Sequence, residues 1–133
     1  AEGAGAVPLA ALIRYREQFA GRRVGLVVSG GNIDLPVLSS IIQRGLVRSG
    51  RLVRLTLEIR DLPGELAKAA ALVGDAGANI VQVLHQRIFT ELPVQNTELQ
   101  FVLQTRGPEH LDELTTALRA AGYRLRLDRG PME

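Results

Sequence analysis

The 133-residue sequence contains no cysteine and no tryptophan, and aromatic residues make up only 4% of it. The absence of cysteine excludes a disulfide framework and a thiolate nucleophile, and it fits a cytoplasmic protein. The scarcity of aromatic side chains argues against nucleic-acid binding by base stacking. No apolar run approaches the roughly 20 residues of a membrane helix, and no signal-peptide pattern opens the chain. We therefore expect no membrane and no nucleic acid among its partners.

Lysine is nearly absent as well, because every basic residue except Lys68 is an arginine, and the formal net charge is +2. The arginines are scattered along the chain, which indicates solvated surface rather than a basic binding patch. An apolar share of 46% and a charged share of 23% are typical of a globular protein. The length suits one domain, or a small domain with an appendage.

Residues 1–50 predict a helix, a strand and a second helix. Pro8 lies near the expected start of the first helix. The apolar run at residues 24–28 is typical of a strand buried on both faces of a parallel sheet. Asp34, followed closely by a proline, predicts the start of the second helix. Each helix has an apolar face, and together these faces contain Leu9, Leu12, Ile13, Leu35, Leu38, Ile41 and Ile42.

Three elements cannot enclose a parallel strand on both sides. We therefore expect residues 1–50 to be the remnant of a larger α/β domain. The first residues, 1–5, are not a natural initiation sequence, which predicts a cut through a longer chain.

Residues 51–128 predict a complete domain. Apolar and polar residues alternate at 53–59, which indicates a strand with one buried face. A helix follows, with Leu66, Ala69, Ala70 and Val73 on one side, and ends at Gly77. The second strand is expected from about Asn79 to Glu91, and Pro93 and Asn96 mark the hairpin loop after it.

The remaining elements complete the pattern. The third strand turns Leu99, Phe101 and Leu103 inward, and after a Gly-Pro turn a helix runs to Gly122. The last strand, at 123–127, again alternates apolar residues with arginine. The order βαββαβ predicts an α+β, ferredoxin-like sandwich with two helices on one face of an antiparallel sheet. Residues 129–133 are expected to form a tail.

The tetrapeptide Ser29, Gly30, Gly31 and Asn32, here called the SGGN segment, lies between the expected strand and the second helix. Strand, glycine turn and helix start form a geometry in which backbone can approach a ligand closely and point free N–H groups at it. The alternative is an ordinary tight turn, as most glycine pairs are.

Residues 61–66, here called the DLPGEL turn, join the second region's first strand to its first helix. Pro63 fixes φ, and Gly64 supplies conformational freedom before the helix. The exposed N–H groups at the helix start carry partial positive charge, which suits a carboxylate. Taken alone, the segment would be an ordinary turn. His85 and His110 have no carboxylate or second histidine at ligand spacing, so each is interpreted as a surface or strand histidine, with His85 a candidate for contact at a subunit boundary.

Residues 51–128 resemble an ACT domain, the amino-acid-sensing module of many metabolic enzymes. The resemblance rests on the DLPGEL turn, on Gly77, Ala78, Asn79 and Ile80, and on the βαββαβ order. It implies that an amino-acid effector binds at this turn, with Asn79 contributed by a neighbouring subunit. The uncovered, partly apolar face of the sheet and its open outer edges predict that chains associate through this module as a homodimer or higher homo-oligomer, with the effector sites at the boundary. The implied effector-binding residues are Asp61, Pro63, Gly64, Glu65, Leu66, Asn79 and Ile80.

Residues 1–50 resemble the C-terminal end of the catalytic domain of pyridoxal-phosphate-dependent threonine dehydratases (threonine ammonia-lyases). The matching residues are 2–6, here called the EGAGA segment, and 25–34, which include the SGGN segment. The resemblance implies a parent enzyme that converts L-threonine to 2-oxobutanoate and ammonia, or deaminates serine. In that enzyme Ser29 would hydrogen-bond the pyridine nitrogen of pyridoxal phosphate. The other implied cofactor-site residues are Gly30, Gly31, Asn32 and Glu2.

An imine with pyridoxal phosphate requires a lysine amine. The only lysine, Lys68, lies on the expected effector-domain helix and matches no catalytic position of the family. We therefore expect this chain to bind no cofactor and to be inactive by itself.

Two other functions remain as alternatives. One is a standalone ACT-type sensing or dimerisation module, although the EGAGA and SGGN segments would then have no purpose. The other is an RNA-recognition fold, which shares the βαββαβ order but needs aromatic residues on the open sheet face. Here Phe101 falls in the buried phase of its strand. Isoleucine, valine, threonine and serine are the candidate effectors.

Overall fold

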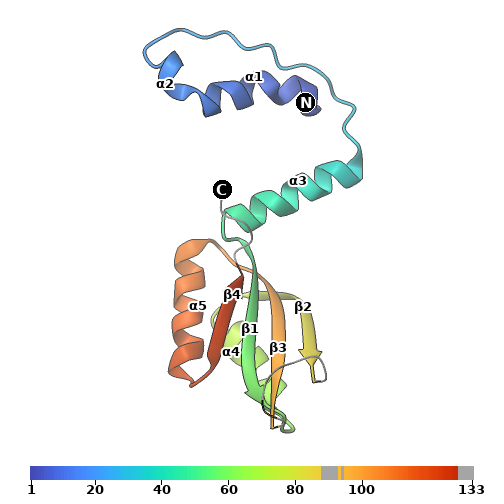
Figure 1. The fold of residues 1–133 in the computed structure, drawn as a ribbon, viewed down its shortest axis with the longest axis vertical. Coiled ribbons are helices and arrows are strands. Elements are labelled where there is room, and N and C mark those ends of the chain that lie inside the picture. Colours follow the sequence, from blue (N-terminus) through green and yellow to red (C-terminus); the bar gives the residue numbers. More distant parts are fainter. Residues whose placement is uncertain (88–92, 94, 129–133) are drawn as a thin grey trace. The chain divides into compact units, whose positions relative to one another are not determined.

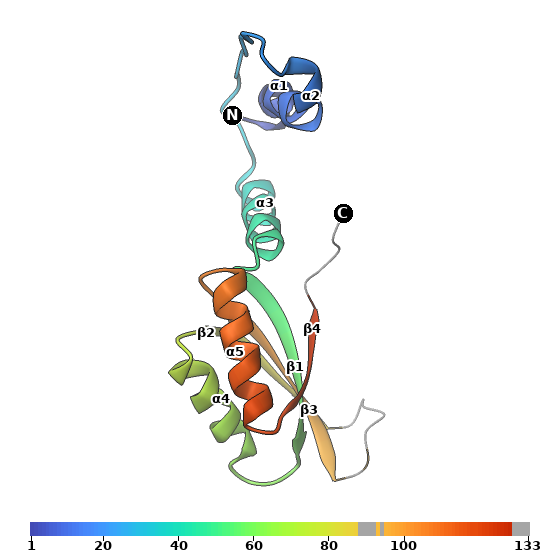
Figure 2. The ribbon, with the colours of Figure 1, turned by 90° about the vertical axis from the view of Figure 1, so that its left-hand side faces the viewer.

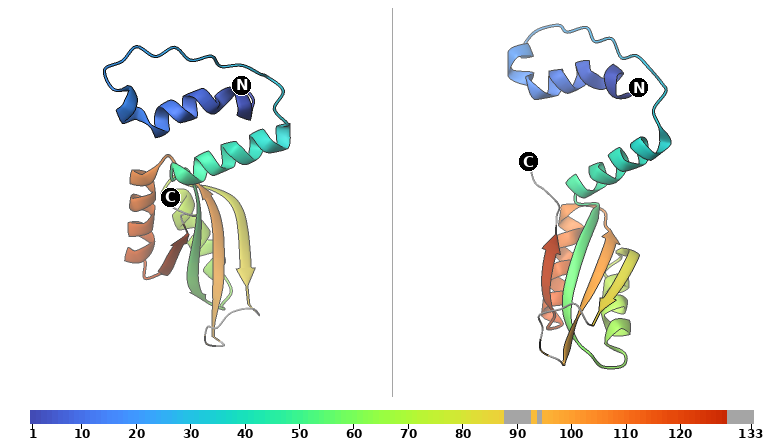
Figure 3. Two further views of the ribbon diagram at one scale, coloured as in Figure 1. Left: turned by 45° about the horizontal axis from the view of Figure 1, so that its top comes forward. Right: turned by 45° about the vertical axis from the view of Figure 1, so that its right-hand side comes forward.

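The computed structural model describes residues 1–87, 93 and 95–128. The chain forms two compact units, Ala1–Ile42 and Gln43–Glu133. The division falls within the long helix α3 (Leu35–Arg48), which Figure 1 and the two views of Figure 3 show as one continuous helix. The boundary expected after residue 50 lies just beyond the end of this helix.

The first unit contains α1 (Gly3–Arg14), the short helix α2 (Arg16–Phe19) and the first turns of α3. The two helices expected here are present. Pro8, however, lies inside α1 and not near its start. The helix begins at Gly3, and the N–H of Ala6 donates to the carbonyl of Glu2 at 3.1 Å, so its first turn forms before the proline.

The strand expected at residues 24–28 is not formed, and residues 23–34 have no regular secondary structure. The side chains of this run are exposed, up to 79% for Val27. A strand is stabilised by hydrogen bonds to a neighbouring strand. The sheet described in this chain contains only segments between Leu52 and Asp128, so the run has no ladder to join.

The second unit is built on a four-stranded antiparallel sheet with the order β2-β3-β1-β4. Its strands are β1 (Leu52–Arg60), β2 (Asn79–Gln86), β3 (Asn96–Gln104) and β4 (Arg124–Asp128). The two helices α4 (Glu65–Asp75) and α5 (Pro108–Ala120) cover one face of the sheet (Figure 2). This is the predicted ferredoxin-like βαββαβ arrangement.

The core lies between the sheet and these two helices, and the predicted alternation is confirmed. Opposite residues on the central strands, such as Leu55 and Phe101, are fully buried. The helices contribute Val73, Leu114 and Leu118 to the same cluster. Because the ring of Phe101 is in this core, it is not available on the open face for the base stacking that an RNA-recognition fold requires.

The open face of the sheet is largely polar, with Val102 and Leu84 among its apolar residues. Ion pairs cross it between Arg54 and Asp128 at 3.2 Å and between Arg124 and Glu58 at 3.9 Å. Such exposed pairs contribute little stability, about 0–1 kcal/mol each. Of the second strand expected at 79–91, the part to Gln86 is confirmed, and Arg87 lies beyond its end. Residues 88–91 and the tail at 129–133 lie outside the described residues.

The hairpin turn expected before β3 is present at Pro93, whose carbonyl accepts a hydrogen bond from the N–H of Asn96 at 2.8 Å. Asn96 itself is the first residue of β3. In the part of the chain that the structure describes, no helix combines the length and apolar character needed to cross a bilayer.

Candidate functional site

In the first unit, the EGAGA and SGGN segments lie against each other. Gly5 is buried, and a Cβ atom at this position would lie 1.5 Å from the carbonyl oxygen of Ser29. Gly30 has φ +77°, and a Cβ there would lie 2.6 Å from Cγ of Glu2. Only glycine allows both approaches. The fold therefore brings together Glu2, Ser29 and Gly30, three of the residues expected at one cofactor site.

The surface that these segments form can serve as one wall of a ligand site. Residues 29–32 are exposed, and a Cβ atom at Gly31 would meet nothing within 4 Å. The Ser29 hydroxyl can donate to or accept from a ring nitrogen. These residues fit one side of a planar cofactor such as pyridoxal phosphate. The required amine is not on this unit, because the only lysine, Lys68, lies on α4 of the second unit.

Within the DLPGEL turn, Gly64 has φ 89° and occupies the N-cap position of α4 without a side-chain cap. The N–H of Glu65 donates to the carbonyl of Leu62 at 3.3 Å. Among the described residues, the N–H groups of Leu66 and Ala67 have no backbone acceptor outside the helix, and first-turn groups have none inside it. Two donors at the positive end of the helix dipole are therefore available to an anionic group.

Two acids of this turn have ion-pair partners within the chain. Asp61 pairs with Arg87, just beyond β2, at 3.1 Å, and its N–H donates to the carbonyl of Gln95 at 2.9 Å. Glu65 pairs with Lys68 at 2.7 Å. Asp61 and Glu65, both expected to bind the effector, thus have partners within the chain. The backbone N–H groups of Leu66 and Ala67 lie at the same end of α4 as these two acids.

Glu65 raises the pKa of two neighbouring groups. The hydrogen bond and the charge of Glu65 raise the pKa of the Lys68 ammonium. Burial raises the pKa of the Tyr123 phenol, and the charge of Glu65 raises it further. Lys68 is therefore held in its protonated, ion-paired form, which is the opposite of what a Schiff-base lysine needs.

Asn79 and Ile80 lie at the other end of the domain from the DLPGEL turn. Asn79 is exposed and begins β2, opposite Gln104 of β3. β2 contains eight residues, so its two ends are separated by about 24 Å. Asn79 therefore cannot contact a small ligand at the DLPGEL turn of its own chain, in keeping with the expectation that a neighbouring subunit supplies it.

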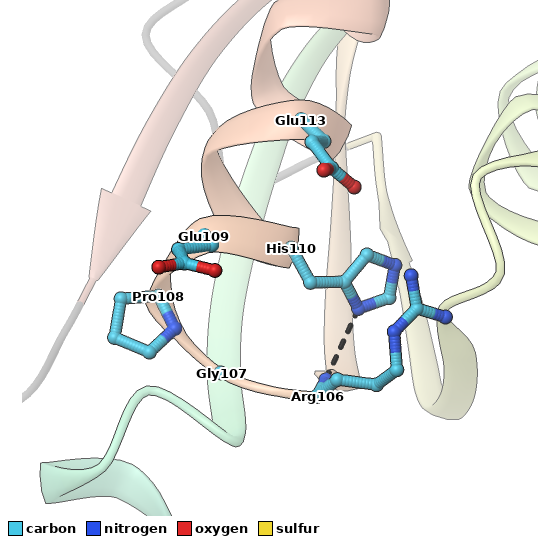
Figure 4. A pocket seen from close by; sticks show the side chains of 6 residues that line it. All are labelled: Arg106, Gly107, Pro108, Glu109, His110 and Glu113. Atoms are coloured by element: carbon cyan, nitrogen blue, oxygen red, sulfur yellow. Dashed lines mark hydrogen bonds between the residues drawn. The ribbon is translucent and has the colours of Figure 1, made fainter.

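The interpretation of His110 as a surface or strand histidine is wrong. His110 lies on α5, is only 4% exposed, and uses both ring nitrogens. Nδ1 accepts a hydrogen bond from the N–H of Arg106 at 3.0 Å, the dashed line in Figure 4. Nε2 lies 2.7 Å from the carbonyl oxygen of Ala76. No sequence pattern signals this role, because the partners are backbone groups of two different connections.

His110 borders an open hollow of about 330 Å³ at the N-terminus of α5. Figure 4 shows Arg106 and Glu113 beside the imidazole. His85, the other histidine, lies on β2 as expected of a strand histidine, and its Nε2 is buried without a partner among the described residues. No group of three or more histidines, cysteines or acids that could hold a metal is found in the described ranges.

Comparison with known proteins connects the two units. The chain is 45% identical over 122 residues to L-threonine ammonia-lyase of Geobacter sulfurreducens, which covers 92% of this chain and 30% of that protein. It is 39% identical over 127 residues to L-threonine ammonia-lyase of Thermotoga maritima, which covers 96% of this chain and 31% of that protein. No family model matches the chain.

The chain belongs to the L-threonine ammonia-lyase family. A shorter match to L-threonine dehydratase biosynthetic IlvA of Bacillus subtilis agrees with this, at 44% identity over 50 residues, or 38% of this chain and 12% of that protein. The chain spans about 30% of the length of the first two relatives. Because those matches cover nearly the whole chain, they include most of both units of this ammonia-lyase part.

Proposed function

We propose that this chain is the regulatory part of a threonine ammonia-lyase. In this proposal the second unit is an ACT-type domain that binds an amino-acid effector between two copies of the chain. The first unit provides one wall of a pyridoxal phosphate site in the whole enzyme. The parent reaction is the deamination of L-threonine to 2-oxobutanoate and ammonia.

The observation that carries the effector site is the uncapped N-terminus of α4. The free N–H groups of Leu66 and Ala67 suit the α-carboxylate of an amino acid. Beside them, the side chains of Leu62 and Leu66 are 55% and 39% exposed, so apolar surface is available to an aliphatic effector side chain. Charge complementarity and apolar contact therefore favour an amino acid over an inorganic anion.

The edge strand β2 supports the dimer. Among the described residues, no strand pairs with its outer edge, and Val81, Val83 and Leu84 are 41–58% exposed. Antiparallel pairing of two β2 strands about a two-fold axis would place Asn79 of one protomer opposite Gln86 of its partner. That end of the partner's β2 adjoins the Arg87–Asp61 ion pair. Asn79 would then reach the effector from the other chain.

The EGAGA and SGGN segments support the catalytic parent. When bound, pyridoxal phosphate supplies the electron sink for deamination. Ser29 would hold a neutral hydrogen bond at the pyridine nitrogen, while Gly30 and Gly31 keep that wall free of side chains. The amine must come from residues outside this sequence, so we expect the purified chain to release no ammonia from threonine.

Calorimetric titration with isoleucine, valine, threonine and serine tests the effector site. We expect heat with at least one of them. Asn79→Ala should weaken that binding at least about tenfold, because the amide makes two hydrogen bonds of about 1 kcal/mol each. Gln82→Ala, on the same exposed strand, is the matched control and should bind normally.

Sedimentation tests the dimer separately. Leu84→Arg should convert the protein to a monomer and abolish effector binding, because it puts a charge on the paired edge. Arg124→Ala, on the opposite edge strand, should leave the dimer intact. If none of the four amino acids gives heat with the unmodified chain, the effector function is wrong.

A further inference from the structure

Three connections of the second unit meet at two buried polar side chains. The connections are the α4–β2 turn, the β3–α5 turn and the segment that follows α3. Thr105 is 5% exposed and His110 is 4% exposed. Each satisfies backbone groups that belong to other connections, so together they join the entry of β2 to the end of α3.

His110 makes the first half of this link. Because the N–H of Arg106 donates to Nδ1, that nitrogen carries no proton, and Nε2 carries the proton that is donated to Ala76. Ala76 is the C-cap residue of α4 and lies three residues before Asn79. The intervening Gly77 has φ 78°, and a Cβ atom at this position would lie 3.2 Å from a guanidinium nitrogen of Arg106. The imidazole thus holds the entry of β2 to the β3–α5 turn.

Thr105 makes the second half. Its hydroxyl donates to the carbonyl of Gly50 at 2.6 Å and accepts from the N–H of Gly107 at 3.3 Å. Its backbone N–H donates to the carbonyl of Arg51 at 2.9 Å. The N–H of Arg51 in turn closes the end of α3 by donating to the carbonyl of Leu46 at 2.8 Å. The same threonine therefore holds the β3–α5 turn to the last turn of α3.

We propose that Thr105 and His110 are positioning residues that couple effector binding at Asn79 to the C-terminal end of α3. The proposal rests on the proposed effector function and names the route by which that site acts. A displacement of the Ala76–Asn79 turn moves the acceptor of His110. Because the His110 ring is buried, it must move with the Ala76 carbonyl or leave a polar atom without a hydrogen bond. A movement of the ring displaces its other partner, Arg106, and through the adjacent Thr105 it displaces the carbonyl of Gly50.

The end of α3 is a useful place to receive this change. The helix begins at Leu35, shortly after the SGGN segment ends at Asn32, so in sequence its two ends lie near the expected cofactor wall and the effector domain. Buried hydrogen bonds transmit displacement well because breaking one is costly and partial satisfaction is rare.

Hydrogen exchange on the full chain tests the coupling. The reporters are the amides of Ser49, Gly50 and Arg51, which are bonded to Gly45, Val47 and Leu46. Addition of whichever of isoleucine, valine, threonine or serine gives heat should change their exchange rates about fivefold, the factor that corresponds to one hydrogen bond. Thr105→Val should remove this response without weakening binding at Asn79 by more than about twofold.

Three further variants make the test specific. Thr105→Ser keeps the hydroxyl and should restore the response. Thr115→Val is the matched control, since Thr115 is equally buried on α5 but bonds only within its helix, to Asp112. His110→Phe should raise the exchange rate of the Arg51 amide about fivefold even without effector. This would show the link directly, because His110 bonds to the turn before β2 and not to Arg51.

The outcomes separate the two proposals. Heat without a change at the three reporter amides overturns the coupling and leaves the effector site intact. A response that survives in both Thr105→Val and His110→Phe also overturns it. The absence of heat with all four amino acids overturns the effector function, and unchanged exchange at Arg51 in His110→Phe then overturns the link itself.

Discussion

The two units of this chain have similar apolar sequences but very different burial. Every buried hydrophobic residue among the described ones belongs to the second unit, whereas Gly5 is the one buried residue of the first. Leu55 is fully buried, and Leu35 is 78% exposed. The difference teaches that an apolar pattern predicts which face of an element will be buried, but burial also needs a surface to cover that face.

The largest expected effect compares one substitution in two helices. Leu114→Ala removes a fully buried side chain of α5 and should lower the free energy of unfolding by about 2–5 kcal/mol. Leu35→Ala removes the same atoms from an exposed position of α3 and should change it by no more than about 0.5 kcal/mol. Urea denaturation measures both. Equal losses would mean that the first unit has a core in solution that this structure lacks.

Within the first unit, Gly5→Ala should separate the EGAGA and SGGN segments. Its Cβ atom would overlap the Ser29 carbonyl oxygen, and backbone on both sides leaves little room for adjustment. We expect the amide resonances of Ser29 and Gly30 to move to random-coil positions in an NMR spectrum. Gly3→Ala, also on α1 but with nothing within 4 Å, should leave them unchanged and favour the helix.

Smaller effects on the free energy of unfolding, opposite in sign to each other, are expected at two glycines of the second unit. Gly64→Ala forces a side chain into a position with φ +89° and should cost about 1–2 kcal/mol. Gly74→Ala lies inside α4 with open space around it and should stabilise the domain by about 0.5–1 kcal/mol. Thermal unfolding distinguishes them. A stabilising Gly64→Ala would show that the DLPGEL turn does not have this conformation in solution.

The smallest expected effect is a loss of stability of the second unit at alkaline pH. The pKa values of Lys68 and Tyr123 are both raised in the folded protein. Groups with raised pKa values bind protons more tightly when folded, so their stabilisation is complete below the unfolded pKa and is lost as pH rises above about 10. The thermal unfolding midpoint of the second unit should therefore decrease as the pH is raised beyond that value. Tyr123→Phe should make this decrease with pH less steep. An equally steep decrease in the variant would argue against burial of the phenol.

The sequence predicted the second unit well because its evidence is local and repeated. The alternation around Leu55 and Phe101 identifies the buried faces, and the DLPGEL turn marks the start of α4 through the conformational needs of Pro63 and Gly64. The contact of Glu2 with Gly30 followed only from the family resemblance. His110 was interpreted wrongly, because a buried histidine that bonds two backbone groups leaves no spacing pattern.

The sequence alone thus determined the order of strands and helices in the second unit and the family to which the chain belongs. Only the tertiary structure decided that residues 24–28 form no strand and that Thr105 and His110 join three connections. The physical reason is that periodicity describes a residue's neighbours along the chain, whereas a strand's partners and a buried polar atom's partners come from segments far away in sequence.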